Sequence, residues 1–135
     1  MNILFLTKYA RMGASSRYRS FQYFPYLEEQ GFNCRCYPLF DDGYLGDLHL
    51  GRRQTGAVLR AFWQRVLVLR EQNDLDLIVI EKELFPFMPT LLERLLGQLK
   101  VPYVVDYDDA LFHQYDCHRN PVVRFILKRK IANVM

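Results

Sequence analysis

The chain of 135 residues is predicted to fold as one α/β domain with an open, Rossmann-like parallel sheet. Four short apolar runs alternate with helical patterns along the chain, and each run is bounded by polar, glycine or proline residues. Apolar strands separated by helices are typical of parallel sheets with helices on both faces. Right-handed crossovers would then place the strands in the order 3-2-1-4.

The first part of the chain is predicted to supply two strands joined by one helix. Residues 2–7 (NILFLT) read as a buried strand, and Ser15 or Ser16 would cap a helix that ends at Gly31. Pro25 should kink or split this helix. Residues 32–39 (FNCRCYPL) alternate in polarity, which favours a second strand.

The middle of the chain is predicted to be a loop followed by an amphipathic helix. Residues 40–54 hold two neighbouring aspartates and three glycines, which indicates a loop. The pattern then predicts a helix over 55–72. Its apolar half would contain Val58, Leu59, Phe62, Trp63, Val66 and Leu67.

The last part of the chain is predicted to add two strands and two helices. The strands are 76–81 (DLIVIE) and 101–106 (VPYVVD), and the helices are 90–99, after Pro89, and 121–135. The final helix has no stop signal, and the fourth strand would be an unprotected apolar edge. We therefore expect the chain to be truncated, with a further strand following it in a larger protein.

Composition excludes several classes of function. A net charge of +3 argues against a dedicated nucleic-acid binder. No apolar run is long enough for a membrane-spanning helix. The odd cysteine set, Cys34, Cys36 and Cys117, lacks a disulfide spacing and predicts free thiols in a reducing, cytoplasmic compartment. Cys34 and Cys36 have no second Cys or His pair nearby, so no metal site is expected.

The loop after the first strand is a candidate anion site. Ligands bind outside the carboxyl ends of parallel strands, where the strand order reverses, here between strands one and four. Gly13 is small, Ser15 and Ser16 open a helix, and Arg17 and Arg19 add forked donors, all of which suit a phosphate or a carboxylate. An ordinary capped helix with solvated arginines is the alternative.

The loop after the fourth strand concentrates carboxylates. Asp106, Asp108 and Asp109 lie within four residues and His113 follows them. We interpret these groups as orienting sugar hydroxyls or another acceptor, in preference to a D-x-D metal motif. A loop held together by side-chain caps is the simpler alternative.

The loop after the third strand joins a polar strand end to an apolar stretch. Glu81, Lys82 and Glu83 stand at the strand end, and residues 84–88 (LFPFM) follow. A polar strand end with an apolar lip describes one side of a cleft. A local ion-pair arrangement around Lys82 is the alternative.

Taken together, five segments resemble the N-terminal domain of GT-B-fold glycosyltransferases of the group 1 (family 4) type. They are NILFLTKYARMGASSRYRSFQYFPYL, CYPLFDDGYL, IEKELFPFMP, VPYVVDYDDALFHQYD and RFILKRKIANVM. The resemblance covers nearly the whole chain and keeps the family's order and spacing. It implies retaining sugar transfer from a nucleotide-sugar, with residues 1–135 as the acceptor-side domain and a C-terminal donor domain outside this chain.

The resemblance also implies roles for individual residues. The family's glycine-containing loop matches residues 13–17 and would face the donor phosphates. The nucleotide-sugar would be a co-substrate, and neither a cofactor nor a metal is expected. Many members place a histidine at the end of the fourth strand, whereas this chain has Asp106-Tyr107-Asp108 there. The candidates for a catalytic group are therefore Asp106, Asp108, Asp109 and His113. The family's paired-glutamate motif belongs to the donor domain, so this chain alone should be inactive.

Two further interpretations remain open. Arginines beside Phe62 and Trp63, or residues 128–130 beside Phe125 and Ile126, would favour peripheral contact with the inner face of an anionic membrane. Packing of these helices on the sheet is the alternative. The whole chain could also be a stand-alone Rossmann-like binding module without transfer activity.

Overall fold

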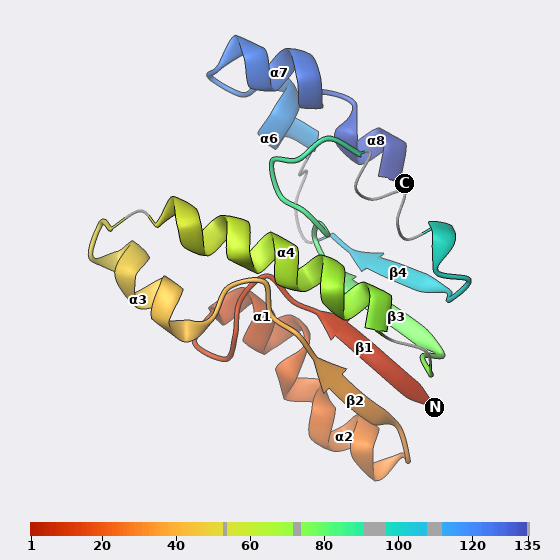
Figure 1. Ribbon diagram of the computed structural model, residues 1–135. Helices are drawn as coiled ribbons and strands as arrows, with labels where there is room; N and C mark the ends of the chain where they lie inside the picture. Colours follow the sequence, from red (N-terminus) through yellow and green to blue (C-terminus); the bar gives the residue numbers. More distant parts are fainter. Residues whose placement is uncertain (53, 72–73, 91–96, 108–111, 135) are drawn as a thin grey trace.

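The computed structural model describes residues 1–52, 54–71, 74–90, 97–107 and 112–134. Over these residues the chain forms a four-stranded, all-parallel sheet with helices on both faces, which confirms the predicted fold class. The strands are β1 (Asn2–Leu6), β2 (Asn33–Cys36), β3 (Leu77–Glu81) and β4 (Tyr103–Asp106). Figure 1 shows α4 across one face of the sheet and α1 and α2 on the other.

The predicted strand order 3-2-1-4 is wrong: the sheet runs β2-β1-β3-β4. β3 pairs directly with β1, from Ile3 opposite Leu77 to Leu6 opposite Ile80. Burial explains the difference, because the continuous apolar run of β3 needs cover on both faces and therefore takes a central position. β2, which carries Asn33 and Arg35, tolerates the edge.

The other register pairs complete the sheet. β1 meets β2 from Asn2 opposite Asn33, and β3 meets β4 from Ile78 opposite Tyr103. Over the described residues β4 is the second edge, as predicted, and its Val104 is 52% exposed.

Alternate residues of the central strands build two cores. Leu4 and Leu6 of β1 face one side, where they join Ile78, Ile80 and helix α4 (Thr55–Glu71). Ile3 and Phe5 face the other side and contact Phe21 and Phe24. A strand buried on both faces needs this unbroken apolar run, since neighbouring side chains point in opposite directions.

The segment after β1 is split into three short pieces. They are α1 (Ala14–Arg19), the 3₁₀ turn η1 (Phe21–Tyr23) and α2 (Phe24–Glu29). Pro25 stands in the first turn of α2, where its missing N–H does no harm, so the predicted split is confirmed. The prediction that Ser15 or Ser16 caps this helix is wrong, because Gly13 is the N-cap residue and both serines lie inside α1.

The loop predicted over 40–54 contains a helix, α3 (Asp42–His49). Asp41 caps it, because its carboxylate accepts a hydrogen bond from the Tyr44 N–H at 2.7 Å. The neighbouring aspartates that suggested a loop are thus a helix start. The glycines at 43 and 46 sit inside the helix.

Helix α4 confirms the prediction for 55–72 over its described residues, but its buried face is rotated. Ala61, Arg65 and Leu69 are buried, whereas Leu59 and Trp63 are 60% and 63% exposed. Phe62 contacts Phe85 edge-on, so it belongs to the core. The buried face of α4 was predicted at the wrong angle, because the prediction took the apolar half of the helix as buried, whereas the charged Arg65 lies at the centre of the buried face.

The C-terminal segment folds as three helices, of which two replace the single helix predicted over 121–135 and one precedes it. They are α6 (Phe112–Asp116), α7 (Pro121–Leu127) and α8 (Lys130–Val134), with a turn between α7 and α8. Tyr115, Leu127 and Ile131 form their shared core. The helix predicted over 90–99 falls largely on residues 91–96, which lie outside the described residues. Among the described residues, no helix combines the length and apolar character needed to cross a bilayer.

Candidate functional site

The strand order moves the point of reversal to β1 and β3. β2 lies on one side of this pair and β4 on the other, so the crevice at the carboxyl ends of parallel strands opens between the loops that follow Leu6 and Glu81. The predicted position of this crevice, between the first and fourth strands, is wrong because β3 separates them. The candidate site is therefore built from residues 7–13 and 82–88.

A buried carboxylate joins these two loops. Glu81, only 3% exposed at the end of β3, accepts hydrogen bonds from the hydroxyls of Ser15 and Ser16, both at 2.6 Å. It also accepts the Lys8 backbone N–H at 3.0 Å. Since Ser16 itself accepts the Tyr9 N–H at 3.0 Å, one network holds the loop from 8 to 16. The structure thus brings together three residues that were predicted in separate loops, with Ser15 and Ser16 both hydrogen-bonded to Glu81.

Gly13 allows the loop to fold back on itself. A Cβ at this position would lie 2.3 Å from the Cβ of Tyr9, closer than any real contact. Burial, and then the nearby Glu81, raise the pKa of the Tyr9 phenol. Gly13 is therefore required for close approach to Tyr9, which forms part of the site wall.

The two predicted arginines of α1 have different surroundings. Arg17 is exposed, and its guanidinium carbon lies 5.3 Å from the ring centre of Tyr18. Arg19 forms an ion pair with Asp106 at the end of β4. Arg17 thus faces solvent beside the crevice, whereas Arg19 ties α1 to the far edge of the sheet.

Glu83 points away from Glu81, toward the C-terminal helices. It is buried, and its two carboxylate oxygens lie 2.7 and 2.9 Å from the Tyr115 hydroxyl, whose single proton they share. It also forms an ion pair with Lys130 at 2.8 Å. Lys130 also donates to the Phe85 carbonyl at 2.5 Å. Lys82, between the two glutamates, has a left-handed backbone with a φ of 63°, which turns the chain between these two directions.

An aromatic pocket of about 380 Å³ lies between the joined loops and α4. Tyr9 comes from the first loop, Pro86, Phe87 and Met88 come from the second, and Phe40 and Tyr44 come from the chain around the start of α3. Lys8 is a cationic group at its wall. The Phe87 N–H donates to the Tyr115 hydroxyl at 3.0 Å, so the network of Glu83 also fixes this apolar lip.

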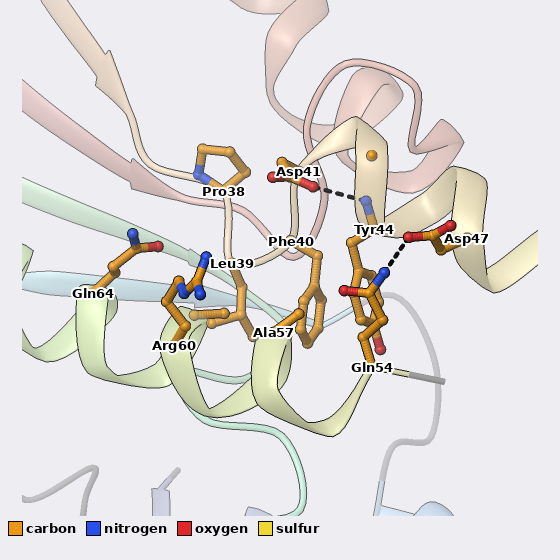
Figure 2. A pocket seen from close by; sticks show the side chains of 12 residues that line it. Pro38, Leu39, Phe40, Asp41, Tyr44, Asp47, Gln54, Ala57, Arg60 and Gln64 are labelled. Atoms are coloured by element: carbon orange, nitrogen blue, oxygen red, sulfur yellow. Dashed lines mark hydrogen bonds between the residues drawn. The ribbon is translucent and has the colours of Figure 1, made fainter. Parts of the chain in front are cut away.

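A second pocket of about 300 Å³ lies on the other side of the ring pair Phe40–Tyr44, which stacks at 4.2 Å. Figure 2 shows Asp41, Asp47 and Gln54 on one side of it, and Arg60 and Gln64 of α4 on the other. The two pockets share Phe40 and Tyr44, so an apolar hollow and a polar hollow adjoin.

Arg65 supports the base of this region from α4. Its guanidinium donates to the Thr7 carbonyl at 2.7 Å and to the Tyr37 carbonyl at 3.1 Å, at the ends of β1 and β2. Burial lowers the pKa of Arg65 to about 10, and it therefore stays charged at neutral pH. Within the described residues its second terminal nitrogen is buried without a hydrogen-bond partner.

The predicted aspartate cluster is only partly placed. Asp106 pairs with Arg19, and His113 lies on α6 with its Nδ1 3.2 Å from an oxygen of Asp116. Asp108 and Asp109 lie outside the described residues. Asp106 and His113 are thus held by different partners.

Several residues of the site were not predicted as functional. Three of them line the aromatic pocket: Tyr9, Phe40 and Tyr44. The other two, Tyr115 and Lys130, form hydrogen bonds with the backbone of the apolar lip. The aspartates before Tyr44 carried the available signal, since an aspartate followed by an apolar pattern marks a helix start. No family model, curated protein or solved structure matches the chain.

Replacement of Gly13 by alanine should destabilise the fold by about 1–3 kcal/mol, because the added methyl group forces Tyr9 away. Gly46→Ala is the matched control inside α3, where an added Cβ would meet no described atom within 4 Å outside the backbone of its own helix; it should stabilise by about 0.5–1 kcal/mol. Urea unfolding followed by circular dichroism measures both. Equal stability of Gly13→Ala and the wild type would contradict the close packing of this loop.

Proposed function

We propose that this chain is the acceptor-side domain of a retaining, nucleotide-sugar-dependent glycosyltransferase with GT-B architecture. What supports the proposal is the convergence of three segments that resemble this family. Residues 8–16, 40–44 and 81–88 are far apart in sequence, yet they surround the aromatic pocket or brace its walls. The fold itself supports only the Rossmann-like class, because one fold serves many functions.

The chemistry of the two pockets suits an acceptor with a sugar part. Small-molecule sites are mostly apolar hollows with a few placed polar groups, and the aromatic pocket with Lys8 at its wall has this character. The adjoining pocket offers carboxylate, amide and guanidinium groups to hydroxyls. The ring pair Phe40–Tyr44 borders both and would contact the face of a bound sugar ring.

Within this proposal the donor is bound by the exposed end of α1 and by a second domain. The hydroxyls of Ser15 and Ser16 donate their hydrogen bonds to Glu81 and are not available to a phosphate. The exposed Arg17 is therefore the group of α1 best placed to contact a donor phosphate. Arg19 and Asp106 position β4 against α1 through their ion pair. Asp108, Asp109 and His113 remain the candidates to orient the acceptor hydroxyl. The nucleotide-sugar is a co-substrate, and no metal takes part in transfer.

The test uses this domain joined to the donor domain that the proposal requires. A panel of nucleotide-sugars is first screened by thermal shift. A donor at about 100 times its Kd should stabilise the protein by about 2.7 kcal/mol. Transfer kinetics with that donor then compare two variants. Phe87→Ala should raise the acceptor KM by roughly 10- to 100-fold through lost apolar contact, and Arg17→Ala should raise the donor KM.

Arg70→Ala, at an exposed position in the last turn of α4, is the control and should change neither constant. Absence of transfer with every donor, together with ligand binding by the 135-residue chain alone, would favour a stand-alone binding module. Normal kinetics in both test variants would remove Phe87 and Arg17 from the site.

We also propose that helix α7 contacts an anionic membrane surface. Val122, Phe125 and Ile126 are 61%, 79% and 57% exposed on one side of the helix. The sequence from 117 to 135 contains basic residues and no acidic ones. Exposed apolar side chains surrounded by cations are typical of helices that lie in a membrane interface. Trp63 and Leu59 form a second exposed apolar patch on α4, whereas Phe62 is partly buried against the core and takes no part.

Sedimentation with liposomes tests this contact. The chain should bind vesicles with anionic lipid at low salt and should release them as salt rises, because the attraction is electrostatic. Phe125→Ala with Ile126→Ala should weaken binding, whereas Leu48→Ala with Leu50→Ala, exposed apolar positions around the end of α3, should not. Equal binding to neutral and anionic vesicles, or none to either, would contradict it.

A further inference from the structure

The last turn of α6 brings three different metal-ligating side chains together. His113, Asp116 and Cys117 are all exposed, and one ligand atom from each lies within 4.8 Å of the others. His113 Nδ1 is 3.2 Å from Asp116 Oδ1 and 3.9 Å from Cys117 Sγ. They occupy positions i, i+3 and i+4, which face the same side of a helix. None of the three lines the aromatic pocket, and only His113 is also a candidate group of the proposed transfer.

The two separations from His113 are close to those of a tetrahedral zinc site. Zinc binds nitrogen and oxygen at about 2.0–2.2 Å and thiolate sulfur at about 2.3 Å. Tetrahedral angles then place a nitrogen roughly 3.4 Å from an oxygen and roughly 3.6 Å from a sulfur. The two observed separations differ from these values by a few tenths of an ångström, which side-chain rotation supplies at exposed positions.

The donor set selects the class of metal. A thiolate with an imidazole and a carboxylate suits zinc and related transition metals, whereas magnesium and calcium prefer oxygen ligands alone. Cys117 would bind such a metal as the thiolate, so the cation replaces the thiol proton, which passes to solvent.

We propose that His113, Asp116 and Cys117 form a binding site for Zn²⁺, with water in the fourth position. The site has a structural consequence for the pocket, because α6 also carries Tyr115. The Tyr115 hydroxyl contacts Glu83 and the Phe87 N–H, so a metal on α6 stiffens the helix that holds the apolar lip. Metal bound to this turn thereby links the C-terminal helices to the order of the pocket.

Cobalt titration of the 135-residue chain tests the site. Co²⁺ should bind with one equivalent per chain and give a thiolate-to-metal charge-transfer absorption, and Zn²⁺ should displace it. Cys117→Ser should abolish this absorption. His113→Gln and Asp116→Asn should each weaken Zn²⁺ binding, measured by competition with a chromophoric chelator, by at least about tenfold.

Two control variants separate this site from other ligands. Cys34→Ala with Cys36→Ala removes the other two thiols, and His49→Gln removes an exposed histidine on α3. Both should keep the absorption and the Zn²⁺ affinity, and circular dichroism checks that every variant is folded. A charge-transfer absorption that survives in Cys117→Ser, binding that is not saturable, or unchanged Zn²⁺ affinity in folded His113→Gln would each overturn the proposal.

Discussion

The arrangement of this domain depends on one buried carboxylate. Glu81 ends the central strand β3, and three hydrogen bonds from Lys8, Ser15 and Ser16 converge on it. A buried carboxylate without such donors would be strongly destabilising, so the loop after β1 must close over it. The buried Arg65 lies within electrostatic reach of Glu81 and braces the ends of β1 and β2 from the opposite side.

The pocket follows from this closure and from a second buried acid. Glu81 fixes Lys8 and Tyr9 on one wall, while Glu83 directs the chain toward Tyr115 and Lys130 and thereby fixes Phe87 on the other. Two glutamates separated by one residue in left-handed conformation therefore position both loops. The hollow between them is preformed by the protein itself, which is what a site at the carboxyl edge of a parallel sheet requires.

The sequence predicted the layers of the fold better than the order of its strands. Apolar runs such as 77–81 identify strands, because a strand buried on both faces needs apolar residues throughout. The order of the strands depends on which strand most needs burial on both faces. The polar residues Asn33 and Arg35 favour the edge position that β2 takes. The site residues of the polar loops were found from their chemistry, but their pairing was not, since Glu81 lies 66 and 65 positions after Ser15 and Ser16 along the chain. Asp116 and Cys117 of the proposed zinc site were not predicted, because their spacing from His113 matches no familiar cysteine motif.

The most direct test of this account is a double-mutant cycle between Glu81 and Ser16, measured by urea unfolding. Glu81→Gln, Ser16→Ala and their combination are compared with a cycle in which exposed Glu29→Gln replaces Glu81→Gln. We expect a coupling of about 1–2 kcal/mol between Glu81 and Ser16, and additivity for Glu29. Additivity within about 0.5 kcal/mol in the Glu81 cycle would show that this carboxylate does not hold the loop.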